Sequence, residues 1–253
     1  MTLLLDSDWL CYSSCCACEH DVRWSDVPGY QQDEHLHTLW CSEQDVLDLI
    51  DDRIKHYQSV ASDKGPVIMC FSDYPTFRHN LHQEYKANRI GKRKPLALKA
   101  IREKIAEKYH SISFDGLEGD DVMALLATGN RYEDPIIVSP DKDMRGVPCR
   151  LLAKDEVELV TRKKADRHWM IQTLCGDRTD NVEGLTGVGP VTANKIIENA
   201  ESLEEMWDKV ERAYVKKKRT YADAVMTARL TRILRDGEYD HVTGEVKLWE
   251  PSL

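Results

Sequence analysis

Three short apolar runs in this chain each lead into an aspartate. Residues 3–5 precede Asp6, residues 68–71 lead to Asp73, and residues 136–138 lead to Asp141. Apolar runs of this length are typical of strands buried on both faces of a parallel sheet. Open sheets of this kind bind their ligands beyond the carboxyl ends of the strands. The three aspartates are therefore predicted to meet at one edge of a sheet.

More carboxylates are expected at the same edge, because acidic clusters recur at residues 118–121, 141–143 and 177–180. Two like charges about 4 Å apart repel by about 4 kcal/mol at an effective dielectric constant near 20. Divalent cations with oxygen ligands compensate such repulsion. Two ions about 3.5–4 Å apart can activate a water molecule and neutralise a leaving oxygen. The pattern predicts metal-assisted phosphoryl chemistry.

Each acidic cluster also has an ordinary explanation. Asp6 could serve as a helix N-cap. Acidic residues at positions 118–121 would be stabilised by the dipole of the helix that follows them. The short spacings within the other two clusters are weak signals when each is taken alone. Only the combination of all the clusters favours a metal site over these alternatives.

The net charge of −9 would argue against a nucleic-acid partner if it were evenly spread. Basic residues are instead concentrated at positions 86–94 and 216–219. Without the ten clustered carboxylates the balance becomes +1; these are Asp6, Asp8, Asp73, Glu118, Asp120, Asp121, Asp141, Asp143, Asp177 and Asp180. Because the distribution of charge matters more than its total, a nucleic-acid partner remains open.

The order of predicted elements indicates an α/β fold followed by a helical part. Strands are predicted at 3–6, 67–71, 112–114, 136–139, 149–152 and 158–160, with helices at 43–57, 97–109 and 120–128. This order favours a mostly parallel sheet flanked by helices. Later helices are predicted at 166–175, 190–200, 203–214 and 221–234, with a brief strand at 246–249. We predict two domains, 1–161 and 162–253, packed directly on each other.

Residues 73–95 are rich in basic and aromatic side chains and offer few positions for a core. They predict a mobile, partly helical excursion beside the acidic edge. Lys86 and Arg89 are three residues apart and are expected on one helical face. A surface charge run is the usual explanation for such residues. Beside clustered carboxylates they become candidates to steer and hold a scissile phosphate.

A glycine-rich stretch at residues 184–189 leads directly into Pro190 and a predicted helix. Glycine permits positive φ and leaves backbone N–H groups uncovered, and proline suits the first helical position. Exposed amides at the start of a helix can bind phosphate. The stretch therefore predicts a sequence-neutral grip on a DNA backbone. A plain turn between two helices is the alternative.

Four of the eight cysteines, Cys11, Cys15, Cys16 and Cys18, lie close together in the sequence near His20. They do not provide the paired CxxC motifs of a zinc ribbon, so buried thiols are preferred to a structural metal site. Without a recognisable secretion signal, disulfides are not expected. No apolar run reaches the ~18 residues of a membrane helix, so we expect a cytoplasmic protein that does not contact membranes.

Five motifs occur in an order that resembles the 5′-nuclease family, which includes flap endonucleases and the 5′-nuclease domain of bacterial DNA polymerase I. The motifs are LDSDWL at 5–10, EYKANR at 84–89, EGDDVM at 118–123, DKD at 141–143 and GDRTDN at 176–181. Residues 184–197 resemble the helical-hairpin DNA grip of the family. Residues 228–251 are similar to the end of the bacteriophage 5′-to-3′ exonucleases. The resemblance covers nearly the whole chain.

The resemblance implies a PIN-like core and a C-terminal helical domain containing a helix-hairpin-helix motif. It implies two or more Mg²⁺ or Mn²⁺ ions. The inner and outer shells of the first would contain Asp6, Asp73, Glu118, Asp120 and Asp121. Asp141 would lie between the ions, and the second would be held by Asp143, Asp177 and Asp180. A potassium ion is implied at the turn of residues 184–189. Asp8 has no general counterpart in the family.

Catalytic roles are implied for Lys86, Arg89 and Asp141, with the two basic residues in a helical arch or clamp. DNA contacts are implied for Tyr85, Lys86, Arg89, Lys92, Arg93, Gly187, Gly189, Thr192 and Lys195. The expected activity is two-metal hydrolysis of DNA from 5′ ends, nicks or flaps. Removal of RNA primers from RNA–DNA hybrids, in phage replication or recombination in the host cytoplasm, would accompany it.

Two other functions remain open on the sequence. An RNA-directed PIN-type nuclease would share the carboxylates, but the predicted DNA-gripping hairpin argues against it. A protein that binds branched DNA without cutting it is the second alternative. The complete set of carboxylates argues against that one.

Overall fold

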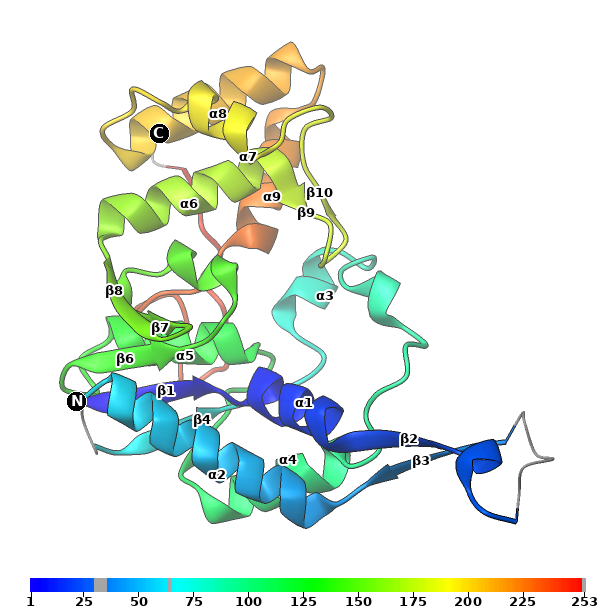
Figure 1. Ribbon diagram of the computed structural model, residues 1–253. Coiled ribbons are helices and arrows are strands. Elements are labelled where there is room, and N and C mark those ends of the chain that lie inside the picture. Colours follow the sequence, from blue (N-terminus) through cyan, green and yellow to red (C-terminus); the bar gives the residue numbers. More distant parts are fainter. Residues whose placement is uncertain (30–35, 63–64, 252–253) are drawn as a thin grey trace.

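A six-stranded sheet with the strand order β5-β4-β1-β6-β7-β8 forms the centre of the structure (Figure 1). The computed structural model describes residues 1–29, 36–62 and 65–251. Neighbouring strands are parallel except for β7 and β8, which confirms the mostly parallel sheet. The strands are β1 (Thr2–Asp6), β4 (Val67–Cys70), β5 (Ser111–Ile112), β6 (Pro135–Val138), β7 (Cys149–Ala153) and β8 (Glu156–Val160).

Both faces of the sheet are covered, because each buried strand presents apolar side chains alternately to the two sides. Leu3 and Leu5 belong to a core with residues of α1 (Ser7–Cys18), α2 (Glu43–Val60) and α4 (Leu98–Lys108). Leu4 faces the other core, which includes α5 (Gly119–Thr128). The apolar runs therefore account for helices on both sides of the sheet, as predicted.

The helical part contains α6 (Arg162–Cys175), α7 (Pro190–Ile196), α8 (Leu203–Lys216) and α9 (Tyr221–Thr231). Two short strands, β9 (Gly176–Asp177) and β10 (Val182–Glu183), follow α6 and were not predicted. Buried aromatic and aliphatic residues, including Trp169, Trp207 and Tyr214, form its core. The helices α7 and α9 end earlier than expected.

The C-terminal segment joins the two parts of the chain. After α9 the backbone returns to the sheet, where Ile233, Leu234 and Tyr239 are buried in the same core as Leu4. The predicted strand at 246–249 is reduced to a single bridge between Tyr239 and Val246. The helical part begins with α6 at residue 162, next to the predicted domain boundary. Because the last segment of the chain returns to the core of the sheet, the division into two domains stays a prediction.

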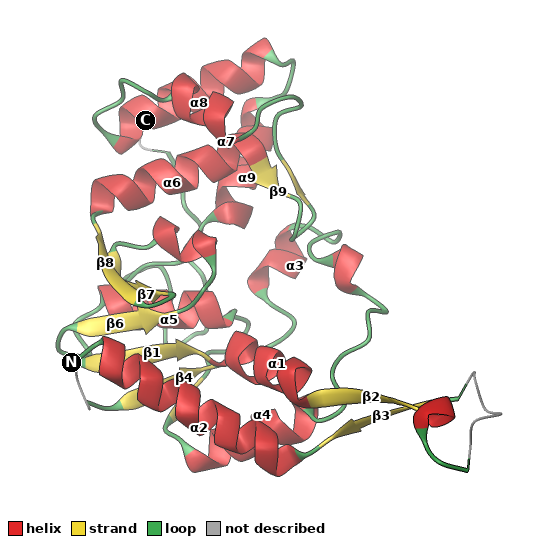
Figure 2. Cartoon of the chain, viewed as in Figure 1, coloured by secondary structure: helices red, strands yellow, loops and turns green. Residues whose placement is uncertain are grey.

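An antiparallel hairpin of β2 (Glu19–Arg23) and β3 (His37–Cys41) was missed by the sequence analysis. It extends from the carboxyl-terminal end of α1 away from the sheet, with the short helix η1 (Trp24–Asp26) next to its tip (Figure 2). Its side chains are mostly exposed. A strand without a buried face lacks the apolar run or alternation by which strands are predicted.

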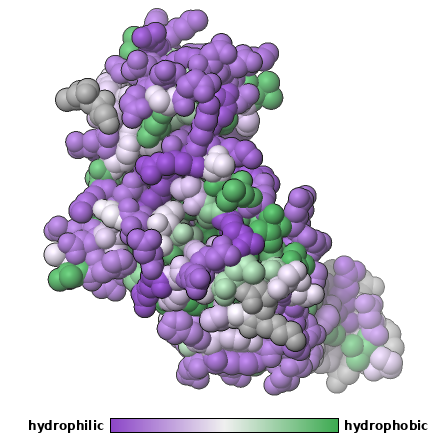
Figure 3. Space-filling model, turned by 90° about the vertical axis from the view of Figure 1, so that its left-hand side faces the viewer, coloured by the Kyte–Doolittle hydropathy of each residue, from purple (hydrophilic) through white to green (hydrophobic). Residues whose placement is uncertain are grey.

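The cysteines are partly buried and partly exposed. Cys11 and Cys15 are buried as expected, but Cys16 is exposed, and all eight cysteines are free. Within the described ranges, no helix is long and apolar enough to cross a membrane. The face shown in Figure 3 is largely hydrophilic, with apolar residues scattered in small groups.

Candidate active site

Asp6, at the carboxyl end of β1, has two roles. Its Oδ1 accepts a hydrogen bond from Trp9 N at 3.0 Å and so caps α1, as the ordinary explanation predicted. Its Oδ2 accepts from Ser139 Oγ at 2.9 Å, just beyond β6. Asp141 follows, and its Oδ1 accepts from the backbone N–H of Asp143 at 2.8 Å, which begins the short helix η3 (Lys142–Gly146). The ends of β1 and β6 are therefore tied together.

The N-terminal end of α5 adds carboxylates to this edge. Glu118 caps the helix and is buried, and Asp120 lies in the first turn. Burial and the charges of Asp6, Asp141 and Glu118 raise the pKa of Asp120 well above its ordinary value. Burial also raises the pKa of Asp6, and the charge of Asp141 adds to that shift. Because the charges of these carboxylates act on one another in addition to burial, they are close neighbours.

A second group of carboxylates lies opposite the first. Burial and the charge of Asp141 raise the pKa of Asp143 to about 7, and Asp177 adds to the shift. Burial raises the pKa of Asp180, in the turn between β9 and β10. Both groups contribute to one pocket, whose lining includes Glu118, Asp120, Asp143, Asp177 and Asp180. The structure thus brings together side chains that are far apart in the sequence.

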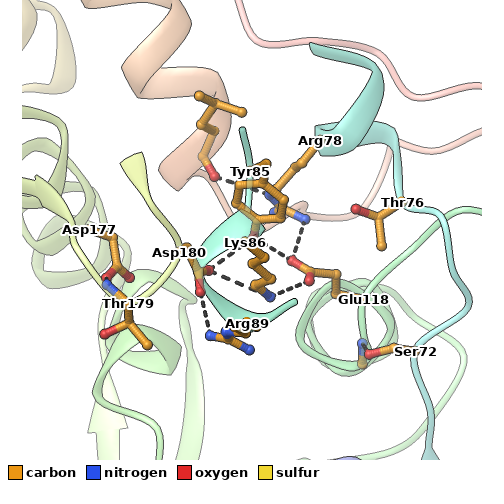
Figure 4. Close-up of polar contacts among 12 residues, drawn as sticks. Ser72, Thr76, Arg78, Tyr85, Lys86, Arg89, Glu118, Asp177, Thr179 and Asp180 are labelled. Carbon is orange, nitrogen blue, oxygen red and sulfur yellow. Dashed lines mark hydrogen bonds and ion pairs between the residues drawn. The ribbon is translucent and has the colours of Figure 1, made fainter. Parts of the chain in front are cut away.

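Two basic side chains neutralise this pocket (Figure 4). Lys86 Nζ donates to Glu118 Oε1 and lies 3.5 Å from Asp180 Oδ2. Arg89 Nη2 donates to Asp180 Oδ1 at 2.5 Å. Burial lowers the pKa of Lys86, but Glu118 and Asp180 outweigh it and raise that pKa above its ordinary value. Lys86 is therefore charged at neutral pH, and both cations face the carboxylates.

Tyr85 is part of the same network and is not a surface residue. It is 3% exposed, so it offers almost no surface to DNA in this conformation, contrary to the predicted contact. Its hydroxyl lies 2.7 Å from Glu118 Oε2 and 3.0 Å from Asp180 Oδ2. Tyr85 thus links a carboxylate of α5 to one of the β9–β10 turn.

Arg78 is a buried anchor that the sequence analysis missed. Its guanidinium donates to Asp121 Oδ1 and Oδ2 at 2.9 and 2.5 Å and to Glu118 Oε2 at 3.2 Å. It also donates to the carbonyls of Leu230 and Arg232. Arg78 therefore joins α3 (Phe77–Leu81), α5 and the end of α9. The sequence does not indicate that Arg78 is buried, because a basic segment contains buried and exposed arginines without a pattern that distinguishes them.

Asp121 and Asp73, predicted for the inner and outer shells of the first metal, each bind a partner within the chain. Asp121 is fully buried, and both of its carboxylate oxygens accept hydrogen bonds from Arg78. Asp73 is exposed, and its Oδ2 accepts a hydrogen bond from Gly116 N at 2.9 Å. No hydrogen bond or ion pair in the described part of the chain joins Asp73 to the pocket. We assign both residues to the framework of the site.

Asp8, which had no expected role, supports the start of α5 through Ser72. Its Oδ2 accepts from Ser72 N at 2.8 Å, and its Oδ1 accepts from Arg102. Ser72 Oγ in turn accepts from Gly119 N at 2.8 Å. Asp8 and Ser72 therefore hold the start of α5, where Glu118 and Asp120 are placed.

The segment at residues 73–95 contacts the turn between β9 and β10. Asn88 Nδ2 donates to Arg178 O at 3.1 Å, and Asn181 Nδ2 donates to Glu84 O at 2.8 Å. These contacts dock the segment on the β9–β10 turn. The segment is partly helical, as predicted, and its expected mobility stays a prediction.

Lys86 and Arg89 do not share one helical face as predicted. Lys86 has φ 55°, in the left-handed region, and precedes the short helix η2 (Ala87–Arg89). The two side chains converge because the chain turns sharply at Lys86. Beyond them, Lys92 and Arg93 are exposed, and Arg93 Nη2 donates to Glu19 Oε1 at 2.5 Å.

The glycine-rich turn leads into α7 at Pro190, as expected. Gly187, Gly189, Thr192 and Lys195, the residues predicted to contact DNA there, are all exposed. Gly187 has φ 76°, which favours glycine, and a Cβ at Gly189 would have no heavy atom within 4 Å. The backbone of this turn is therefore open to a large ligand.

The fit of the pocket to divalent cations can be judged from the donor atoms. Its oxygen donors are those that Mg²⁺ and Mn²⁺ prefer. Asp143 Oδ1 is buried and has no hydrogen-bond partner among the described residues, although the ammonium of Lys142 lies 3.3 Å from it. Over the same part of the chain, no three His, Cys, Asp or Glu side chains form a ready-made metal-binding group. Instead, Lys86 and Arg89 form ion pairs with Glu118 and Asp180. The oxygen donors of the pocket would suit metal ions once these ion pairs are broken.

Comparisons with known proteins cover nearly the whole chain. A family model described as 5′-3′ exonuclease, N-terminal resolvase-like domain, matches residues 42–174, and one described as 5′-3′ exonuclease, C-terminal SAM fold, matches residues 164–252. An exodeoxyribonuclease of Enterobacteria phage T3 is 28% identical over 98% of this chain and 92% of its own length. An exonuclease of Escherichia phage T7 is also 28% identical, over 98% of this chain and 93% of its own length.

A solved structure of the T5 5′-exonuclease with bound zinc has the same fold, with a TM-score of 0.61 at 15% identity. The match covers 91% of this chain and 88% of that chain. The catalytic core of Rad2 in complex with DNA is also similar, with a TM-score of 0.53 at 14% identity over 99% of this chain and 83% of that one. These likenesses support the arrangement of sheet and helices described above.

Proposed function

The chain belongs to the 5′-3′ exonuclease family, and we propose that it is a metal-dependent enzyme that hydrolyses phosphodiester bonds at DNA 5′ ends and 5′ flaps. The observation that carries this proposal is the single pocket lined by Glu118, Asp120, Asp143, Asp177 and Asp180. Lys86 and Arg89 face the same carboxylates. An enzyme that cuts a phosphate diester needs both negative ligands for metal ions and positive groups for the phosphate.

Two groups of residues would hold the divalent cations, Mg²⁺ or Mn²⁺. Asp6, Glu118 and Asp120 would bind on one side, Asp143, Asp177 and Asp180 on the other, with Asp141 between them. Bound ions would supply the charge that activates water and neutralises the leaving oxygen. The raised pKa values of Asp6, Asp120 and Asp143 support this assignment, because burial and the neighbouring carboxylates raise them and a bound cation would relieve both effects.

Lys86 and Arg89 would hold the scissile phosphate. Both now neutralise carboxylates, so a metal ion at Glu118 and Asp180 would replace them there. The freed ammonium and guanidinium groups would then lie beside the pocket with no change in the fold. Charged donors of this kind stabilise the negative charge that develops on a phosphate during hydrolysis.

The helical part would bind the DNA duplex through its backbone. Gly187, Gly189, Thr192 and Lys195 lie on one exposed turn and the helix after it, where amides, a hydroxyl and an ammonium can contact phosphates. Lys92 and Arg93 would extend this surface next to the pocket. Contacts of this kind carry no base information, so we propose cleavage that does not depend on sequence.

Finer aspects of the function follow from the same contacts. The groups proposed to act would contact phosphates, which RNA and DNA share, so we propose that RNA–DNA hybrid 5′ ends are also cut. Relatives from phages T3 and T7 favour a role in phage DNA replication or recombination. The place of action would then be the host cytoplasm, where that DNA is copied.

The test is incubation of the purified protein with 5′-labelled duplex, nicked, flapped and RNA-primed DNA, with Mg²⁺ or with EDTA. We expect short 5′ products that require the metal ion. The variants Asp143→Asn and Asp180→Asn serve as matched controls and should cleave at least about a hundredfold more slowly. Binding of all substrates without any cleavage in Mg²⁺ or Mn²⁺ would reject the enzyme. Preference for single-stranded RNA over every DNA substrate would favour the RNA-directed alternative.

A further inference from the structure

The turn between β10 and α7 has one carbonyl oxygen that a distant side chain binds. Val188 N donates to Leu185 O at 3.0 Å and closes a four-residue turn. Gly187, the third residue, has φ 76°, the left-handed value that a type II turn requires at that position. The carbonyl of Thr186, the second residue, takes no part in closing the turn. It accepts a hydrogen bond from Lys217 Nζ at 2.9 Å.

The end of α8 fixes the position of Lys217. Tyr214, one turn earlier, is 1% exposed, and its hydroxyl donates to Thr173 O at 2.7 Å, which anchors α8 on α6. Lys217 N donates to Tyr214 O at 3.0 Å, and Lys218 then adopts φ 60° and reverses the chain. The side chain of Lys217 therefore reaches the turn from a fixed backbone. A Cβ at Gly187 would lie 4.0 Å from its Nζ.

An ammonium group and a potassium ion would compete for the same place. Both carry one positive charge and are bound by oxygen acceptors, and an ammonium has donors only. With Thr186 O already bound to Lys217, a second cation would lose this oxygen and would be repelled by the charge beside it. The turn therefore does not fit the potassium ion that the family resemblance implies.

We propose that Lys217 supplies this positive charge from within the chain, so that the hairpin binds DNA without a monovalent metal ion. Lys217 would satisfy the Thr186 carbonyl and leave the amides of Gly187 and Gly189 to contact DNA. This inference rests on the proposed role of the hairpin in binding DNA. It adds that DNA affinity depends on the ionic strength but not on which monovalent cation is present.

The experiment measures the binding of a fluorescent blunt duplex by anisotropy in EDTA, so that no cleavage takes place. Potassium chloride is compared with choline chloride at equal ionic strength, because choline is too large to replace potassium at a turn. The proteins are the wild type, Lys217→Met and the matched control Lys216→Met. Lys216 is also exposed and carries the same charge, one residue earlier. Thermal melting of each variant checks that it is folded.

We expect the wild type and Lys216→Met each to have the same Kd in the two salts. Lys217→Met should bind about fivefold more weakly in choline, the typical effect of one lost hydrogen bond, and recover in potassium as the ion replaces the ammonium. Wild-type binding that needs potassium would overturn the inference. So would a loss in Lys217→Met that potassium does not restore, or an equal loss in Lys216→Met. Failure of the wild type to bind DNA in either salt would instead count against the proposed function.

Discussion

Replacement of Arg78 by methionine should be one of the most damaging single changes in this protein. Arg78 and Asp121 are 3% and 0% exposed, so methionine would leave a buried carboxylate without its cation. Breaking such a pair from one side costs about 3–5 kcal/mol. The carbonyls of Leu230 and Arg232 would also lose a donor, at about 1 kcal/mol each. Allowing for overlap, we predict a loss of about 5 kcal/mol in the free energy of unfolding.

That loss is large beside the roughly 5–15 kcal/mol by which folded domains are stable. The assay is urea unfolding of the metal-free protein, followed by tryptophan fluorescence. Arg89→Met is the control, because Arg89 is 46% exposed and its pairing with Asp180 should contribute less than about 1 kcal/mol.

A double variant separates the ion pair from simple loss of packing. If the damage comes from the unpaired carboxylate, Arg78→Met with Asp121→Leu should be more stable than Arg78→Met alone. The reasoning would be refuted if Arg78→Met cost less than about 1.5 kcal/mol. It would also be refuted if Asp121→Leu brought no recovery in the double variant.

Other predictions concern the pocket. Asp143→Asn and Asp180→Asn should each slow cleavage by at least about a hundredfold while DNA binding, measured by anisotropy, is kept; near-normal turnover would remove them from the ligand set. The pKa of Asp143 is about 7 without metal, so below that pH an ion must displace a proton, and Mn²⁺ affinity measured by calorimetry should rise with pH and level off above about 7. Because the pKa of Asp143 is raised in the folded state, the metal-free protein should lose stability as the pH rises from about 4 to about 7. Asp143→Asn should remove this contribution to the change of the free energy of unfolding with pH. Lys86→Met should slow cleavage, and Lys86→Met and Arg89→Met should each reduce the salt dependence of DNA binding by about one unit of slope; an unchanged slope would argue against phosphate contacts.

The carboxylates that follow β1 and β6, Asp6 and Asp141, illustrate what a sequence can predict about a site. Apolar strands at residues 3–5 and 136–138 are recognisable because both of their faces are buried. The carboxylate after each strand then has to lie at the carboxyl edge of the sheet. The contact between Asp6 and Ser139 follows from that topology.

Asp121 and Arg78 illustrate what a sequence pattern cannot predict. Asp121 belongs to the same acidic motif as Glu118 and Asp120, yet the first helical turn points it toward Arg78 and the backbone of Leu234. Its partner comes from a segment whose composition indicated an exposed, mobile region. Which of several neighbouring carboxylates faces a pocket depends on helix orientation and on segments brought in from elsewhere in the chain.

The sequence by itself determined the sheet, most of its helices and the edge where the acidic residues gather, because these depend on local apolar patterns and on strand direction. Only the tertiary structure decided which residues neutralise one another there. Lys86 reaches Glu118 through a left-handed turn, and Lys217 reaches Thr186 from another helix. Such pairings join residues distant in sequence and leave no periodic trace, since an ion pair or a single hydrogen bond is set by where two side chains end in space.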